Sequence, residues 1–108
     1  MTTLGDLGEF EVIRRLAAAR GAAGAGVVVD SGDDAAVLRS SPGFDLVATT
    51  DAFVSGEHFL PAWSPPRRSG ARLAQANLSD LAAMAAQPRW ALLSIGARRE
   101  SAIEDLVA

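Results

Sequence analysis

The sequence predicts one α+β domain in which a mixed or antiparallel sheet carries helices on one face. Two patterns predict it. Apolar residues recur at three- and four-residue spacing in two long segments, as they do in amphipathic helices. Short runs rich in β-branched residues, bounded by glycine, proline, serine and aspartate, are typical of strands joined by turns. A length of 108 residues suffices for one small domain and not for two.

The first helix is expected over residues 7–20. Asp6 is its predicted N-cap, with Glu9 three positions later as the partner of a capping box. Gly21 and Gly24 are expected to end it. Strands are expected next, and they cover three ranges: 26–29, 35–38 and 44–50.

A second, longer helix is predicted to begin near Pro65 or Pro66, since proline suits the first turn, and to run to about Ala86. A final strand is expected over residues 89–96, with residues 90–95 as its core. A last helix is predicted to start around Ser101, with its hydroxyl as the cap and Glu104 as the capping-box partner.

Composition excludes several classes of function. A net charge of −3 offers no broad basic field for nucleic acid or for an anionic membrane. The absence of cysteine excludes disulfides, thiolate zinc sites and cysteine nucleophiles. No stretch reaches the roughly 20 apolar residues of a membrane span, and the first residues do not form a signal peptide. We therefore expect a cytoplasmic protein with no membrane or nucleic-acid partner.

Four aspartates in three places along the chain suggest chemistry. Asp33 and Asp34 follow a glycine just after a β-branched run, Asp51 ends a strand directly after two threonines, and Asp80 lies on the long helix three residues after Asn77. Two such charges about 5 Å apart repel by roughly 3 kcal/mol at an effective dielectric constant of about 20, so a cluster of them needs protons or cations. Carboxylates and hydroxyls favour magnesium over zinc, and magnesium often bridges to phosphate oxygens. The pattern points to phosphoryl transfer.

Ordinary structural roles compete with this interpretation. Gly-Asp-Asp is a common turn, Thr-Thr-Asp often caps the element that follows it, and Asp80 could simply face solvent. A lone histidine such as His58 is more often a structural hydrogen-bonding group than a catalytic one. Local sequence alone favours these simpler roles, and no single motif decides between them.

Taken in order, several segments resemble the thiamine-monophosphate kinase family. The resemblance runs from about residue 8 to residue 96 and rests on these motifs: Gly8-Glu9-Phe10, Gly32-Asp33-Asp34-Ala35-Ala36-Val37-Leu38, Thr49-Thr50-Asp51, Gly56-Glu57-His58-Phe59, Asn77-Leu78-Ser79-Asp80-Leu81-Ala82-Ala83-Met84 and Pro88-Arg89-Trp90-Ala91-Leu92. The motif that begins at Asn77 is the most specific of them.

The family belongs to the aminoimidazole-ribonucleotide-synthetase-like superfamily. The resemblance implies that residues 1–108 are the N-terminal ATP- and magnesium-binding domain, which pairs with a second copy and builds a shared β-barrel in a homodimer. It also implies several magnesium ions, ATP as co-substrate, and direct transfer of the γ-phosphoryl group to thiamine monophosphate to give thiamine diphosphate.

The resemblance assigns roles position by position. The implied metal ligands are Asp34, Thr49, Thr50, Asp51 and Asp80. His58 is implied at the thiamine-phosphate site, with Asp33 and Asn77 as supporting residues. No protein side chain is expected to act as a catalytic base, because the substrate phosphate is itself the nucleophile.

The chain also departs from the family pattern. Asp30 and Ser31 precede Gly32 where the family usually has a second glycine, and Ala85 stands where it tends to have glycine. The family's second Gly-Gly-Asp motif and its C-terminal domain are missing. We therefore expect the chain to be a truncated piece that is inactive alone and that dimerises or aggregates.

Two alternatives stay open. The chain could serve as a non-catalytic dimerisation or nucleotide-binding module of the same fold. It could also act on another substrate of the superfamily, as a purine-biosynthetic synthetase does, although the motifs that contain His58 and Asp80 argue against this second alternative.

Overall fold

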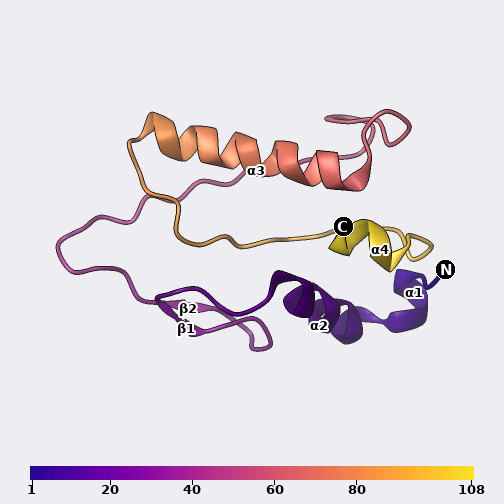
Figure 1. Cartoon of the computed structure of the whole chain (residues 1–108), viewed down its shortest axis with the longest axis horizontal. Helices are drawn as coiled ribbons and strands as arrows, with labels where there is room; N and C mark the ends of the chain where they lie inside the picture. Colours follow the sequence, from indigo (N-terminus) through magenta and orange to yellow (C-terminus); the bar gives the residue numbers. More distant parts are fainter. The chain divides into compact units, whose positions relative to one another are not determined.

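The computed structural model describes residues 1–108, which form two compact units (Figure 1). Unit 1 comprises Met1–Phe44 and Leu92–Ala108, and unit 2 comprises Asp45–Ala91. The elements in chain order are α1 (Leu4–Leu7), α2 (Glu9–Arg20), β1 (Val27–Val29), β2 (Val37–Leu38), α3 (Pro66–Ala83) and α4 (Ile103–Val107). Only α3 lies in unit 2. The α+β class is confirmed, with a sheet of two antiparallel strands.

The N-terminal helical region is two helices rather than one. Thr3 is the N-cap of α1, and its hydroxyl donates a hydrogen bond of 2.6 Å to the Asp6 carboxylate. Asp6 is therefore the third-position partner of a capping box, and its predicted role as N-cap of a longer helix is wrong. The interruption occurs at Gly8, whose φ of +75° is a conformation that favours glycine. Glu9 then begins α2 instead of completing a capping box.

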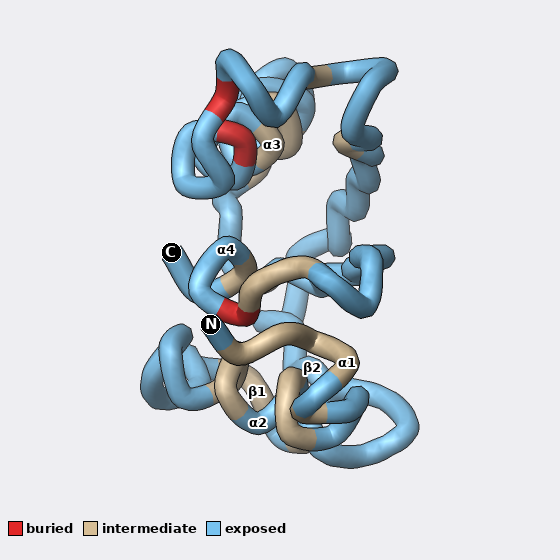
Figure 2. The backbone as a smooth tube through the Cα atoms, turned by 90° about the vertical axis from the view of Figure 1, so that its right-hand side faces the viewer, coloured by how far each residue is buried: buried red, intermediate tan, exposed pale blue.

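The two ends of the chain lie side by side within unit 1. The Leu4 N–H donates to the Ser101 carbonyl at 2.9 Å, and the Ile103 N–H donates to the Thr2 carbonyl at 3.1 Å. This pairing starts α4 at Ile103, after Ala102 as N-cap, so the predicted capping by Ser101 is wrong. Ile103 is the one buried apolar side chain, at 2% exposure, and Figure 2 shows how small the buried regions are.

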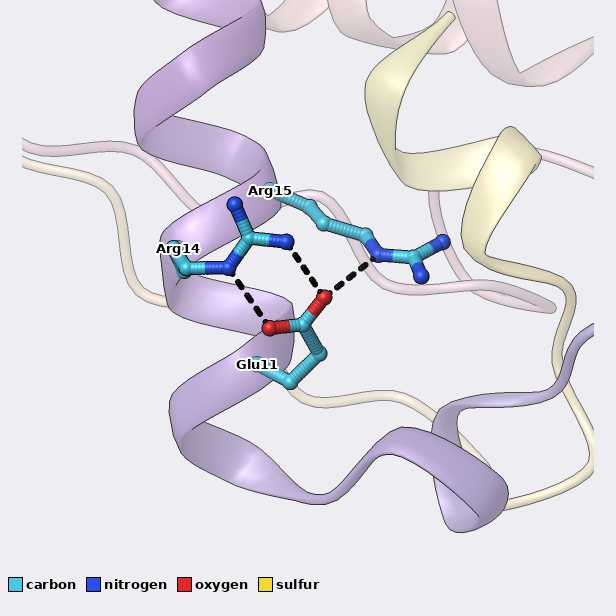
Figure 3. A network of polar contacts seen from close by, with 3 residues as sticks. All are labelled: Glu11, Arg14 and Arg15. Atoms are coloured by element: carbon cyan, nitrogen blue, oxygen red, sulfur yellow. Dashed lines mark hydrogen bonds and ion pairs between the residues drawn. The ribbon is translucent and has the colours of Figure 1, made fainter.

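Helix α2 carries a surface network of charges (Figure 3). The Glu11 carboxylate accepts hydrogen bonds from Arg14 at 2.7 Å and from Arg15 at 2.9 Å. These hydrogen bonds, from Arg14 first and then from Arg15, lower the pKa of Glu11 to about 2. The network joins three neighbours on one helix surface at the i,i+3 and i,i+4 spacing that such pairs require.

The acidic loop connects the two strands of the sheet. Strand β1 pairs with β2 in antiparallel register, with Val27 opposite Leu38 and Val29 opposite Val37. The register shifts between those two pairs, so the ladder is short and irregular. The loop that carries Asp33 and Asp34 is therefore the turn of a β-hairpin.

Two predicted strands are absent from the structure. Residues 44–50 and 90–95 form no hydrogen-bonded ladder, and most of their large side chains are exposed, among them Leu46 at 68% and Leu92 at 83%. The β-rich composition of these segments suits an extended backbone but does not specify a partner strand. A strand needs such a neighbour, and neither segment has one in this chain.

Helix α3 dominates unit 2 and has clear ends. Of the two prolines predicted at its start, Pro66 is the first helical residue and Pro65 is the N-cap. The buried hydroxyls of Ser64 and Ser69 share a hydrogen bond of 2.8 Å across this start. It ends at Ala83, about one turn's length earlier than expected, in a left-handed turn at Ala85. No helix in the structure is both long enough and apolar enough to cross a lipid bilayer.

Candidate functional site

Two of the predicted metal-binding motifs meet in unit 2. The Thr49 hydroxyl donates a hydrogen bond of 3.2 Å to Oδ2 of Asp80, which lies near the end of α3. Both residues are exposed, so the pair faces solvent. A hydroxyl and a carboxylate from motifs 31 residues apart are thus brought to one place.

The other predicted residues of unit 2 are held by local contacts. The Asp51 carboxylate accepts the Ala52 N–H at 2.8 Å, which leaves its second oxygen available. The Asn77 side-chain amide donates to the Leu73 carbonyl at 3.0 Å, one turn earlier on α3. Asn77 and Asp80 are three residues apart on this helix, as the sequence predicted. Asn77 donates one N–H of its amide to the helix, and its amide oxygen is the atom that could bind a metal ion.

The acidic hairpin turn belongs to unit 1. Oδ1 of Asp33 accepts the Asp34 N–H at 2.8 Å, and Gly32 adopts a φ of +119° that lets the chain turn. Asp33 is thereby occupied in shaping the turn. The Asp34 carboxylate is exposed, and no hydrogen bond or ion pair engages it.

The extra acidic residue at the base of this turn is paired. Asp30 accepts two hydrogen bonds from the Arg20 guanidinium, each of 2.7 Å, and its Oδ1 also accepts the Ser31 N–H at 2.7 Å. These contacts, Arg20 first, hold the pKa of the Asp30 carboxyl well below its ordinary range. The carboxylate ties the end of α2 to the hairpin, because bidentate pairs of this kind fix geometry as well as charge.

The predicted metal ligands come from both units. Asp34 lies in unit 1, whereas Thr49, Thr50, Asp51 and Asp80 lie in unit 2. No group of three or more His, Asp or Glu side chains stands close enough together in the structure to hold a metal ion. The contact between Thr49 and Asp80 is the one direct hydrogen bond between predicted ligands of different motifs.

An aromatic cluster surrounds His58 in unit 2. The Phe53 ring stacks on His58, with centroids 5.8 Å apart, and on Phe59 at 5.6 Å. The Arg72 guanidinium, from α3, lies 5.1 Å from the centroid of the same ring. We call Phe53, His58, Phe59 and Arg72 the Phe53 cluster.

The tautomer of His58 follows from its backbone contact. Its Nδ1 accepts the Val54 N–H at 3.0 Å, so Nδ1 carries no proton and the neutral ring has its proton on Nε2. The backbone N–H of His58 donates a hydrogen bond of 2.8 Å to the Val54 carbonyl and so closes the turn that presents the side chain. The turn includes Gly56 at a φ of +87°. His58 is thus a fixed hydrogen-bond donor at Nε2.

A separate hollow of about 550 Å³ lies in unit 1, between α1, α2, α4 and the segment around residues 93–99. Its lining is mainly apolar and contains none of the predicted site residues.

Sequence reasoning did not anticipate Phe53, Arg72 or the pairing of Arg20 with Asp30. Arg72 stands two turns before Asp80 on α3, and this helical spacing could have indicated it. The other contacts join segments through loops, for which the sequence holds no periodic signal.

Comparison with known proteins defines the family. Residues 32–108 match the family described as AIR synthase related protein, N-terminal domain. The chain belongs to this family. The match starts in the acidic hairpin and includes every predicted site residue.

Several relatives of this AIR synthase related domain are named thiamine-monophosphate kinase. That of Corynebacterium glutamicum is 45% identical over 103 residues, which cover 94% of this chain and 29% of that protein. That of Caulobacter vibrioides is 51% identical over 70 residues, 65% of this chain and 20% of the relative. That of Mycobacterium tuberculosis is 37% identical over 99 residues, 92% of this chain and 29% of the relative. The resemblance found in the sequence is therefore confirmed.

The chain spans less than a third of the length of these relatives. No solved structure matches it.

Proposed function

We propose that the protein carrying this chain transfers the γ-phosphoryl group of ATP to thiamine monophosphate and so forms thiamine diphosphate. This chain would supply the N-terminal ATP- and magnesium-binding domain. The observation that carries the proposal is the hydrogen bond between Thr49 and Asp80, because it joins two motifs to which the resemblance assigns metal ligands. The names of the relatives support the choice of substrate.

The donor atoms in unit 2 suit magnesium. The Thr49 hydroxyl and the carboxylates of Asp51 and Asp80 offer oxygen atoms only, which is the chemistry that hard divalent cations prefer. Thr50, and Asp34 from the hairpin turn, would complete the set that the resemblance implies. Magnesium, when bound, would neutralise charge on these carboxylates and on the phosphates.

The protein's own residues would work mainly by positioning. The acceptor is a phosphate oxygen that is already ionised at neutral pH, so no side chain needs to remove a proton. The Thr49 hydroxyl fixes one oxygen of Asp80 and leaves the other free to serve a ligand. His58 would donate a hydrogen bond from Nε2 to the substrate, since its Nδ1 is engaged by the backbone.

Assembly as a homodimer is part of the proposal. The extended segments 44–50 and 90–95 have exposed apolar side chains, among them Phe44 at 78% and Leu93 at 69%. Pairing with a second copy would give these segments strand partners and would bury those side chains, which supports the shared β-barrel that the resemblance implies. ATP and a soluble phosphorylated substrate are consistent with a cytoplasmic protein.

The same exposed segments favour one alternative. The chain could act as a non-catalytic dimerisation or nucleotide-binding module of the AIR synthase related fold. Dimer formation without any turnover would support that alternative.

Turnover of the full-length protein tests the proposal. Purified protein with ATP, magnesium and thiamine monophosphate should produce thiamine diphosphate, and chelation of the metal should stop the reaction. Formation of no thiamine diphosphate, or turnover of an aminoimidazole precursor instead, would overturn it.

A further inference from the structure

The guanidinium cation of Arg72 has N–H groups at its edge that are available for hydrogen bonding. Its guanidinium lies over the face of Phe53, 5.1 Å from the ring centroid. Stacking occupies the face of a guanidinium and leaves the N–H groups at its edge free to donate. No ion pair joins Arg72 to a carboxylate, whereas the arginines Arg14, Arg15 and Arg20 are paired with Glu11 or Asp30.

His58 brings a second donor to the same ring. Its imidazole stacks on Phe53 with centroids 5.8 Å apart, and its Nε2–H has no partner within the chain. The two donors stand on segments fixed by different means, Arg72 by α3 and His58 by its hydrogen-bonded turn. A planar cation and a neutral N–H donor around one aromatic ring match an anion that has several acceptor oxygens.

We propose that Arg72 binds the phosphate group of thiamine monophosphate, with Phe53 as the surface that fixes the guanidinium and His58 as a second donor. This inference rests on the proposed function and adds the residue that recognises the acceptor phosphate. Arg72 serves better than a lysine here, because its planar group stacks on an aromatic ring and binds phosphate at the same time.

The charge of Arg72 also orients the substrate. Thiamine monophosphate carries a positive thiazolium ring at one end and a negative phosphate at the other, so Arg72 attracts the phosphate end and repels the ring. Arg72 and Asp80 lie two turns apart on α3, about 12 Å along the helix axis. A phosphate at Arg72 therefore lies on the same helix as the carboxylate proposed to hold magnesium and ATP.

Comparing thiamine monophosphate with thiamine tests the contact between Arg72 and the phosphate. Titration calorimetry on the full-length protein would give the Kd of thiamine monophosphate and of thiamine, which lacks the phosphate. The native protein should bind thiamine monophosphate more tightly. Arg72→Ala should weaken binding of thiamine monophosphate by about tenfold or more and leave binding of thiamine almost unchanged, because charge-assisted contacts to phosphate are strong. Arg72→Lys should restore part of the difference.

Two further variants separate recognition from general effects. Arg68→Ala removes the same charge one turn earlier on α3, at another exposed position, and should keep the preference for the phosphorylated ligand. Phe53→Leu keeps an apolar side chain but removes the stacking surface, so it should lose part of that preference.

Three results would contradict the role of Arg72, and measurements of turnover separate that role from the proposed function. Equal weakening of both ligands by Arg72→Ala, no weakening of either, or failure of the native protein to bind either ligand would overturn the role of Arg72. Turnover to thiamine diphosphate with an unaffected Arg72→Ala variant would reject this inference and keep the proposed function. If Arg72 is needed for the preference for thiamine monophosphate over thiamine but no thiamine diphosphate forms, the proposed kinase activity is wrong and the phosphate-binding role of Arg72 stands.

Discussion

The Thr49 hydroxyl donates a hydrogen bond of 3.2 Å to the Asp80 carboxylate, across 31 residues of sequence. The bond fixes one oxygen of Asp80 and leaves the other free. Thr49→Val keeps the shape of the side chain and removes the hydroxyl. We expect it to weaken magnesium binding by about tenfold, because it removes a hydrogen bond to a charged group and a ligand oxygen.

Thr49→Ser is the matched control for this change, because it retains the hydroxyl. Its magnesium affinity, measured by calorimetry in the presence of ATP, should stay within about threefold of the native value. Equal affinities for the valine and serine variants would contradict the assigned role of Thr49.

The acidic hairpin contains carboxylates with different expected roles. Asp30 is held by two hydrogen bonds from Arg20, whereas Asp34 is exposed and unpaired. Asp34→Asn should therefore reduce magnesium affinity by about tenfold or more, since a charged ligand is lost, and Asp30→Asn should change it little. Calorimetric titration of both variants checks this, and a larger loss for Asp30→Asn would show that the wrong carboxylate has been assigned.

The end of α3 offers a stability test. Ala85 has a φ of +52°, and the bonds Ala86 N–H to Leu81 and Ala85 N–H to Ala82 form a Schellman motif. Alanine is strained in this left-handed conformation by about 1–2 kcal/mol. Ala85→Gly should stabilise the fold by about 0.5–1 kcal/mol after the entropic cost of glycine is subtracted.

A control on the same helix sharpens the comparison. Ala82→Gly, inside α3, should destabilise the fold by about 1 kcal/mol. Urea unfolding monitored by circular dichroism gives both values. Destabilisation by Ala85→Gly would show that the chain does not adopt the left-handed turn in solution.

Glu11 gives a test of pH dependence. Hydrogen bonds from Arg14 and then Arg15 lower its pKa from 4.5 to about 2 in the folded state. A carboxyl with a lowered folded pKa stabilises the fold fully above 4.5 and loses this contribution as the pH falls toward 2. Glu11→Gln should thus be less stable than the native protein at about pH 6, and the gap should shrink by about pH 2.5.

Urea midpoints at the two pH values measure this gap. Glu9→Gln, on the same helix, removes a carboxylate that has no ion pair and should show no such narrowing. A gap for Glu11→Gln that stays constant with pH would mean that the network is not formed in solution.

Local sequence patterns predicted the elements that local interactions determine. Helix α3 was expected from its apolar spacing and the prolines at its start. The hairpin strands were expected from the β-branched run at residues 26–29 and the apolar residues 35–38. The residues 44–50 and 90–95 were predicted as strands and are not, because β-composition describes a backbone preference while a ladder requires a partner. Caps were misplaced at Asp6 and Ser101 for a related reason. The N- and C-terminal segments pair with each other, which shifts where each helix starts.

The candidate site shows the same division. The Asp51 and Asp80 motifs were found because their residues stand close in sequence or at helical spacing. Arg72 was missed, since its relation to Phe53 depends on how the chain between residues 53 and 72 folds back. The family resemblance predicted roles for His58 and the acidic residues, and it gave no indication of the pairing of Arg20 with Asp30.

We propose that the carboxylates of this domain support magnesium-dependent phosphorylation of thiamine monophosphate. The most direct test compares the rate of thiamine diphosphate formation by the full-length protein with Asp51→Asn and with Asp45→Asn, the same change at an exposed aspartate outside the motifs. We expect the rate to fall by about a hundredfold or more for Asp51→Asn and to change little for Asp45→Asn. A loss below about tenfold for Asp51→Asn, or similar losses for both variants, would contradict it.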